Sequence, residues 1–191
     1  MVERFTRTAA GHFNIARGQL ATVQLAGGEA ELRWGLLPPW QGHGGKRGPT
    51  IHVAPVDKVA ATPFLRTACA KRRCLVLADG FYAWRKLARG KQAYWVHAPG
   101  QIALAGIAAT NKDDGVASFA IITVPAAPLV VPFAHEMPAI VDARWLESAE
   151  LVPLELASWR ADAVSDHVDD VAHDDARCVA PLGNPAQGEL F

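Results

Sequence analysis

Short alternating and apolar runs dominate the pattern of hydrophobic and polar positions along the chain. Alternation is typical of a strand with one buried face, and short apolar runs bounded by turn residues are typical of buried strands. Glycine and proline turn signals, such as Gly27-Gly28 and Pro99-Gly100, separate the runs. Five of them are predicted to be strands: QLATVQL (19–25), AELRW (30–34), AYWVHA (93–98), QIALAGIAAT (101–110) and FAIITV (119–124).

The stretch KRRCLVLADGFYAW (71–84) is predicted to be a hairpin around which the other elements are organised. Three cations lead into a buried strand, and Asp79-Gly80 supplies a turn signal. Beyond that turn, alternation places Tyr82 and Trp84 on one face and the two residues that alternate with them on the other. The rings either fill a core or form an aromatic surface flanked by the cations.

Two segments carry helical patterns that prolines interrupt. Residues 53–71 predict a short helix, a break at Pro63 and a second helical turn. Residues 143–158 predict a later helix that is interrupted at Pro153. Helices are therefore expected to be few and short.

Residues 35–40, GLLPPW, cannot continue as a regular element because neither proline has a backbone N–H. Such a segment usually lies along a surface. There it presents Trp34 and Trp40 either to packed neighbours or to something flat, such as a nucleobase. The glycine-rich basic loop that follows, 41–49, lacks the Ser/Thr-bearing signature of a phosphate-cradling loop, so we expect a flexible surface loop.

Composition favours one domain of the α+β class, mostly β, with short strands and a few short helices. The chain has 191 residues, of which 50% are hydrophobic, enough for one well-buried domain and short for two. No apolar stretch resembles a signal peptide, and prolines interrupt the longest apolar run, 119–134, so we expect a cytoplasmic protein without a membrane partner. Three cysteines without a CxxC pair support neither a disulfide framework nor a zinc site, and no cofactor or metal is expected.

The formal net charge of zero conceals an asymmetry. Residues 1–110 hold 15 Lys and Arg against 5 Asp and Glu, and residues 111–191 hold 4 against 14. Cations gathered in one part of a neutral protein can form a local phosphate-binding surface. Alternatively, the two halves attract each other across one domain.

Six motifs together resemble those of the SOS response-associated peptidase (SRAP) family, in order and in approximate spacing over about residues 1–180. They are RWGLLPPW (33–40), RRCLVLADGFYAW (72–84), ALAGI (103–107), FAIIT (119–123), HEMPAIV (135–141) and VSDHV (164–168). The resemblance implies a mostly β fold with a barrel-like mixed or antiparallel sheet and a basic groove for single-stranded DNA. It also implies that removal of Met1 frees an N-terminal cysteine, which couples to the aldehyde of an abasic site.

The residues that would carry this chemistry are replaced here. The family's cysteine, asparagine, glutamate and histidine fall at Val2, His52, Ala83 and Ala134. Without a thiol to close a thiazolidine or side chains to move protons, we expect the family's crosslinking and peptidase reactions to be absent. The neighbouring residues His135 and Glu136 are candidate substitutes, although a one-residue shift normally turns a side chain to the other face.

Residues that match the family's DNA-binding positions are retained. Guanidinium groups suit phosphates and indoles suit bases, so binding is expected to outlast chemistry. The matching phosphate-binding arginines and groove-shaping residues are Arg4, Trp34, Pro38, Trp40, Arg66, Arg73, Trp84, Thr123 and Met137.

Residues 181–191 are expected to form a flexible tail that carries a sliding-clamp motif. Gln187, Leu190 and Phe191 match the pentapeptide Gln-Leu-x-Leu-Phe with which bacterial polymerases and repair proteins engage the clamp, while Gly188 departs from it.

Three functional hypotheses follow from the sequence. The chain is a degenerate DNA-binding adaptor in damage tolerance, an altered enzyme whose Val2 amine forms an imine, or a protein-interaction module without DNA.

Overall fold

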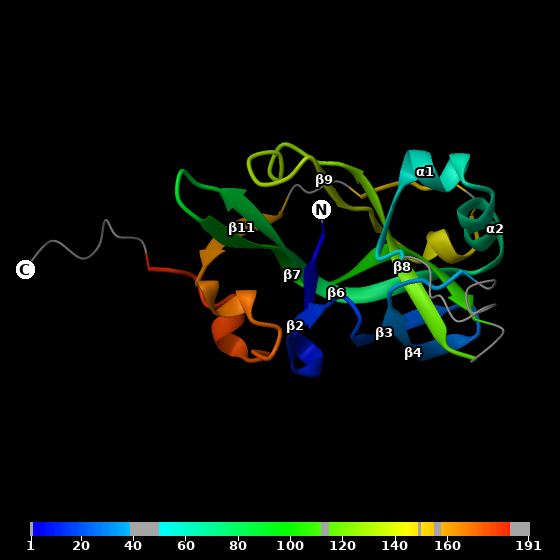
Figure 1. Cartoon of the computed structure of the whole chain (residues 1–191), viewed down its shortest axis with the longest axis horizontal. Coiled ribbons are helices and arrows are strands. Elements are labelled where there is room, and N and C mark those ends of the chain that lie inside the picture. The colour runs from blue at the N-terminus through cyan, green and yellow to red at the C-terminus, as the bar shows by residue number, and fades with distance from the viewer. Residues whose placement is uncertain (1, 39–49, 112–114, 149, 155–157, 184–191) are drawn as a thin grey trace, which may run out of the picture.

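Two long antiparallel strands, β6 (Arg73–Lys86) and β7 (Lys91–Thr110), form the hairpin around which the other elements are arranged (Figure 1). The computed structural model describes residues 2–38, 50–111, 115–148, 150–154 and 158–183. The remaining described strands are β1 (Arg4–Arg7), β2 (His12–Ala16), β3 (Leu20–Leu25), β4 (Gly28–Trp34), β5 (Val53–Pro55), β8 (Ala117–Pro125), β9 (Glu136–Pro138), β10 (Ile140–Val141) and β11 (Arg160–Val164). The described helices are α1 (Val56–Ala61), α2 (Pro63–Lys71) and the short 3-10 helices η1 (Thr8–Ala10), η2 (Ala143–Leu146), η3 (Asp166–Asp169) and η4 (Ala176–Val179).

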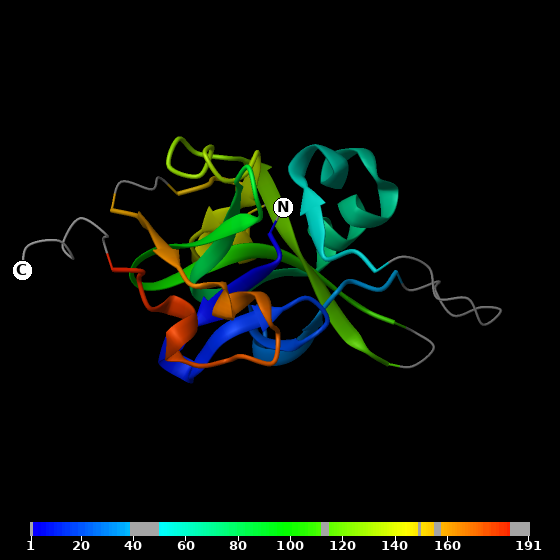
Figure 2. The same cartoon turned by 60° about the vertical axis from the view of Figure 1, so that its left-hand side comes forward.

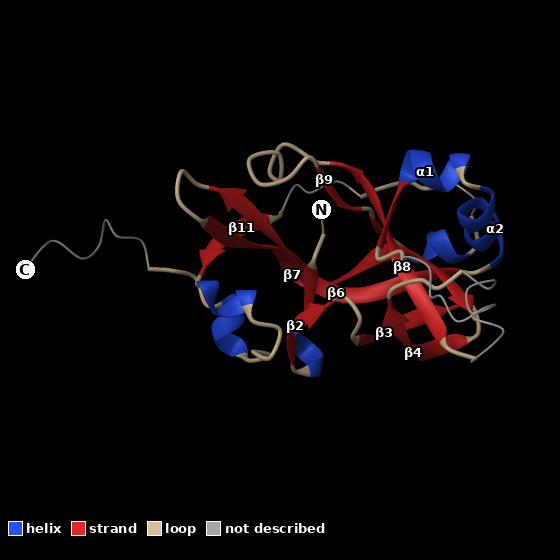
Figure 3. Cartoon of the chain, in the orientation of Figure 1, coloured by secondary structure: helices blue, strands red, loops and turns tan. Residues whose placement is uncertain are grey.

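Five of the strands close into a mixed barrel. Going round, β7 pairs with β8, β8 with β4, β4 with β3, β3 with β6, and β6 with β7 again. The β4–β8 pair is parallel, with Trp34 opposite Phe119, and the other four pairs are antiparallel. The predicted α+β, mostly β class with a barrel-like sheet is confirmed, and Figure 3 shows how little of the chain is helical.

Aromatic side chains fill the barrel. Trp34 is fully buried, with its ring centroid 5.2 Å from that of Phe5 and 6.5 Å from that of Phe119. Its indole Nε1 donates a hydrogen bond of 2.7 Å to the carbonyl of His52, so the one polar atom of the ring is satisfied. Of the two interpretations of Trp34, the structure therefore shows packed neighbours and not an exposed stacking surface.

The predicted hairpin turn at Asp79-Gly80 is wrong, because β6 continues through it as one strand. The pairing with β7 shifts between Ala78 and Gly80, which marks a β-bulge, and the chain reverses instead between β6 and β7. A Cβ at position 80 would lie 2.6 Å from the Trp95 Nε1 and 2.7 Å from the Val96 carbonyl oxygen. Glycine is therefore required here by close packing and not by a turn.

The predicted division of faces along this strand is confirmed. Phe81 and Ala83 pack in the barrel core. Tyr82 and Trp84 belong to a separate small cluster with Val168 of η3. The second cluster attaches the last described part of the chain to the barrel.

The strands predicted at 93–98 and 101–110 form a single element, β7. Gly80 of β6 lies opposite His97 of β7, and Ala78 lies opposite Ile102. More residues of β7 than of β6 therefore lie between these two pairs, and the extra residues of β7 bulge outward. Gly100 has φ +86° in this bulge. Here Pro99-Gly100 bends a strand and does not end it.

The helix expected over 53–71 is confirmed as two helices, α1 and α2, with Pro63 at the first position of the second. The helix expected over 143–158 is wrong over the described residues. A short 3-10 turn, η2, is followed by irregular chain at 147–148 and 150–154. The loop 41–49, with Trp40, lies outside the described residues.

Residues 165–180, here called the acidic segment, are built from η3, η4 and turns, and they follow β11 at the edge of the sheet (Figure 2). The segment contains Asp166, Asp169, Asp170, Asp174 and Asp175, with Arg177 as its only Lys or Arg. Asn14 of β2 holds it through side-chain N–H bonds to backbone carbonyls of residues 168, 170 and 173. None of the described helices is long and apolar enough to cross a membrane.

Candidate functional site

A cleft of about 560 Å³ lies between β6, the N-terminal residues and the loop that precedes β9. Val2 and Glu3 come from the N-terminal side, and the loop contributes residues 131–136. The Tyr94 ring stacks on Phe133 with centroids 4.2 Å apart, which anchors that loop to β7. The other residues that line the cleft are Phe81, Tyr82, Ala83, Trp84, Arg85, Lys86 and Lys91.

Three of the four positions at which the family's chemical residues are replaced line this one cleft. Val2, Ala83 and Ala134 are distant in sequence, and the pairing of β1 with β6 brings the first two close. All three side chains are small and apolar, so none can attack an aldehyde or transfer a proton. The fourth, His52, is not part of the lining, and burial together with the nearby Arg17 lowers its pKa.

His135 and Glu136 both line the cleft, and of these two the structure shows a side-chain hydrogen bond for Glu136. Its Oε2 accepts a hydrogen bond of 3.1 Å from the hydroxyl of buried Thr123, whose strand β8 pairs with β9. His135 is exposed, and Met137 is buried with its sulfur 3.3 Å from the backbone nitrogen of Ala127. Thr123 and Met137 therefore shape the wall of the cleft from behind.

Trp84 also lines the cleft, and polar contacts hold its indole in place. Its Nε1 donates to the Oδ1 of Asp169 at 2.8 Å, and Lys91 Nζ lies 5.1 Å from the ring centroid. The Arg4 guanidinium lies over the same indole, 6.0 Å from the centroid. These contacts leave a half-buried ring at the cleft, and of the two cations over it Lys91 belongs to the lining and Arg4 does not.

The predicted phosphate-binding arginines differ in their surroundings. Arg4 donates to the carbonyls of Val168 and Asp169, the latter at 2.6 Å, so its guanidinium ties the acidic segment to β1. Arg73 donates to the carbonyls of Cys69 and Leu146. Both guanidiniums thus bind the protein's own backbone, and their contact with phosphates stays a prediction.

The other retained positions do not gather at the cleft. Arg66 is exposed on α2, and it is not part of the lining. Trp34 and Pro38 are buried, so neither offers a face to a base, and their role in shaping a groove stays a prediction. Trp40 lies outside the described residues.

The sequence analysis missed the cationic rim of the cleft. Arg85 and Lys86, at the end of β6, are exposed and line it together with Lys91. The available signal is the basic composition of residues 85–91, but this stretch carries no family motif, so the sequence indicates only a basic turn. Strand pairing places these cations beside Trp84, so an aromatic ring and positive charges meet at one opening.

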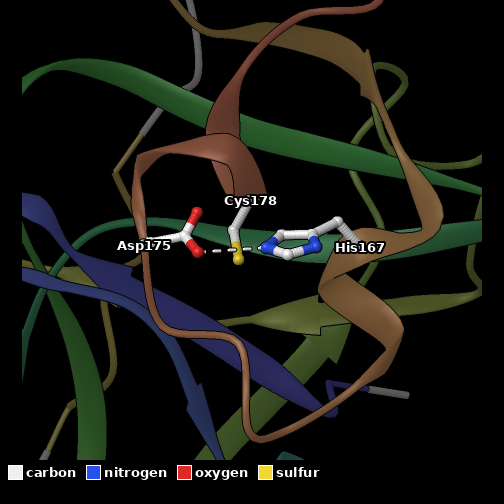
Figure 4. Close-up of side chains that lie close together, drawn as sticks. All are labelled: His167, Asp175 and Cys178. Carbon is white, nitrogen blue, oxygen red and sulfur yellow. Dashed lines mark hydrogen bonds and ion pairs between the residues drawn. The ribbon is translucent and has the colours of Figure 1, made fainter.

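A second group of chemically capable side chains lies in the acidic segment. His167, Asp175 and Cys178 place one nitrogen, one oxygen and one sulfur within 4.8 Å of one another (Figure 4). The three come from η3, the cap of η4 and η4 itself, and they are separate from the lining of the cleft. These are residue types that can hold a metal ion, and the cysteine spacing alone does not indicate their proximity.

Comparisons with known proteins agree with the family motifs. The model of the family described as SOS response associated peptidase (SRAP) matches residues 2–171. The chain is 26% identical over 191 residues to the abasic site processing protein HMCES of Gallus gallus, covering 80% of this chain and 57% of the relative. It is 32% identical over 79 residues to the abasic site processing protein YoaM of Bacillus subtilis (strain 168), covering 39% of this chain and 34% of the relative. Each alignment spans less than two thirds of the relative's own length.

Solved structures share the fold. A crystal structure of a protein from Bacteroides thetaiotaomicron superposes with a TM-score of 0.73 at 21% identity, covering 86% of this chain and 82% of that one. The crystal structure of a phage-related protein from Bordetella bronchiseptica gives a TM-score of 0.63 at 24% identity, covering 79% and 80%. At these identities the likeness concerns the fold alone.

Proposed function

Because the chain belongs to the SOS response associated peptidase (SRAP) family, we propose that it binds single-stranded or damaged DNA in its cleft without forming a covalent bond. The observation that carries this proposal is the composition of the cleft. Its floor has Val2, Ala83 and Ala134 in place of reactive groups, while its rim keeps an indole and three cations. The groups that can bind DNA are therefore kept in the same cleft from which the reactive groups are missing.

The rim has the two features that single strands require. Phosphates would lie against Arg85, Lys86 and Lys91, and a base would stack on the half-buried indole of Trp84. Such stacking is worth about 1–3 kcal/mol per base and tolerates any sequence, since every base has a π-face. The phosphate contacts release counterions, so affinity would fall steeply with added salt.

The apolar floor suits a nucleotide that has lost its base. Small side chains at positions 2, 83 and 134 leave room for an extruded sugar, while the surrounding cations hold its flanking phosphates. The relatives are named abasic site processing proteins, which supports damaged DNA as the class of ligand. The role that follows is recognition of a lesion during damage tolerance, without processing it.

A sliding-clamp tether would deliver this domain to replication. The proposal rests on the sequence motif of Gln187, Leu190 and Phe191, which lies outside the described residues. The motif needs no catalysis in the domain that it carries. It fits an adaptor whose action is to occupy a damaged template.

The test combines fluorescence anisotropy with denaturing gels, using protein from which Met1 has been removed. Single-stranded oligonucleotides with and without one abasic site are titrated, then resolved with and without borohydride. We expect saturable, salt-sensitive binding and no covalent species. A crosslink without reductant, or one trapped by borohydride through the Val2 amine, would replace this proposal with an altered enzyme. Absence of any anisotropy change would favour a protein-interaction module.

A further inference from the structure

We propose that His167, Asp175 and Cys178 form a binding site for a zinc-like divalent cation in the acidic segment. His167 Nε2 and Asp175 Oδ2 are 3.1 Å apart, and Cys178 Sγ lies within 4.8 Å of both. In a tetrahedral zinc site, bonds of about 2.0–2.3 Å place neighbouring ligand atoms roughly 3.3–3.6 Å apart. Only small side-chain shifts separate the present arrangement from coordination (Figure 4).

Neighbouring groups already orient two of the three ligands. His167 stacks on His173 with centroids 3.7 Å apart and an interplanar angle of 10°. The other oxygen of Asp175, Oδ1, accepts hydrogen bonds from the Arg177 backbone N–H at 2.9 Å and from its Nε at 3.1 Å. Such outer contacts fix ligand orientation in metal sites. On binding, Asp175 Oδ2 would exchange its contacts with His167 and with the exposed Arg177 guanidinium for the cation.

Charge and burial fit the same conclusion. Five aspartates within ten residues make the acidic segment attractive to a cation. Cys178 is fully buried, which keeps its sulfur away from competing oxidants, while His167 and Asp175 are only partly buried and give the ion a path in. On binding, the Cys178 thiol proton is released to solvent and the thiolate coordinates the metal. A water would complete the tetrahedral shell.

The ligand set also selects among cations. One nitrogen, one thiolate sulfur and one carboxylate oxygen suit zinc and its borderline-soft neighbours, whereas Mg²⁺ and Ca²⁺ require oxygen ligands. The segment contributes only Val168 and Cys178 to the buried residues of the small apolar cluster that it shares with the sheet. A metal would therefore stabilise η3 and η4, and through them the Asp169 contacts to Arg4 and Trp84.

The test uses the tag-free full chain under reducing conditions, with Zn²⁺, Co²⁺ and Mg²⁺ as probes. We expect one equivalent of Zn²⁺ in calorimetry, a rise in melting temperature, no response to Mg²⁺, and thiolate-to-cobalt charge-transfer absorption with Co²⁺. His167→Gln should weaken Zn²⁺ binding about tenfold or more, in the range of metal-site substitutions. DNA is absent from every arm, so failure here is distinguishable from failure of the proposed function.

Matched controls separate the site from the bulk of the acidic segment. His12→Gln removes a histidine that also pairs with an aspartate of this segment, Asp174, at 3.1 Å, but it has no cysteine beside it. Cys69→Ser removes the partly buried cysteine of α2. Both should bind Zn²⁺ normally, while Cys178→Ser should abolish the cobalt charge-transfer absorption. If Cys178→Ser does not fold, the Zn²⁺ affinities of His167→Gln and Asp175→Asn test the proposal in its place. Unchanged Zn²⁺ affinity in those two variants, or no saturable Zn²⁺ binding by the wild type, would overturn the proposal.

Discussion

The indole Nε1 of Trp84 donates a 2.8 Å hydrogen bond to the carboxylate of Asp169, which joins the wall of the cleft to the acidic segment. The same carboxylate oxygen lies 3.0 Å from Lys91 Nζ, and the lysine in turn sits over the indole. One aspartate therefore sets the position of both the ring and a cation at the cleft. The shape of the cleft therefore depends on a residue that does not line it.

Asp169→Ala should destabilise the protein by about 1–3 kcal/mol, since hydrogen bonds to charged groups are worth about 1.5–3 kcal/mol and the exposed ion pair adds little. Urea unfolding measures the change. Asp169→Asn keeps an oxygen that can accept from the indole, so it should lose less than the alanine variant. Equal losses in the two variants would show that the charge, and not the indole contact, carries the effect.

Gly80→Ala should destabilise the protein by about 1–3 kcal/mol, the usual cost of forcing an extra methyl group into a packed site. The added Cβ would meet the Trp95 indole at 2.6 Å and a β7 carbonyl at 2.7 Å, neither of which can easily move. Gly27→Ala is the matched control, because no atom lies within 4 Å of its Cβ and its φ is not positive. Thermal unfolding compares the two; similar losses would contradict the close packing described at position 80.

Much of the barrel could be predicted from the sequence because alternation reports directly on which side of a strand is buried. The faces of residues 81–84 followed from that rule, and so did the break between the two helices at Pro63. At Asp79-Gly80 and Pro99-Gly100 the sequence predicts the ends of strands, because turns and bulges use the same residue types. Only the pairing of β6 with β7 distinguishes them.

The site was predictable only in part. Family motifs drew attention to Val2, Ala83 and Ala134, and the structure places all three in one cleft. Arg4 and Arg73 could not be assigned from sequence, because an arginine that binds a carbonyl looks the same as one that binds a phosphate. The ligand set of His167, Asp175 and Cys178 has no standard spacing, so it became visible only when η3 and η4 were placed together.

Arg85→Ala and Lys86→Ala should each weaken single-stranded DNA binding and reduce the slope of log affinity against log salt by about 0.7, the value for one lost phosphate contact on a single strand. Anisotropy titrations at several salt concentrations measure both quantities. Lys58→Ala is the control, since Lys58 is exposed on α1 and lies outside the cleft. An unchanged slope in both rim variants would place the DNA elsewhere.

Arg66→Ala serves as a second reporter of the DNA path. The side chain is exposed on α2, which lies apart from the cleft lining, so any effect on affinity would show that the strand continues over that helix. We expect a smaller loss of affinity than for Arg85→Ala. A larger loss would move the main phosphate contacts from the cleft to α2.

Val2→Cys alone should recover little crosslinking to abasic DNA. An N-terminal amine and an aldehyde give an imine and water, and the thiolate then adds to the imine carbon to close a thiazolidine, but Ala83 and Ala134 leave the proton transfers unsupported. The triple variant with Ala83→Glu and Ala134→His should form a stable crosslink on denaturing gels. A version with Met1 retained is the control, because its cysteine amine is blocked. Rapid crosslinking by Val2→Cys alone would show that the missing groups are dispensable.

The clamp proposal predicts that changing Leu190 and Phe191 together to alanine abolishes binding to a purified bacterial sliding clamp. In recognition of short peptides, apolar side chains that fill pockets supply specificity, and removing two such anchors leaves only backbone contacts. Gly188 stands where the motif has leucine, so the wild-type affinity should be weak to moderate. Leu182→Ala is the matched control: it removes an exposed leucine, 48% accessible, that precedes the motif. Surface plasmon resonance with immobilised clamp measures all three proteins. Binding that persists in the double variant, or that disappears equally in Leu182→Ala, would show that the motif is not what binds the clamp. The domain would then have to find damaged DNA by its cleft alone.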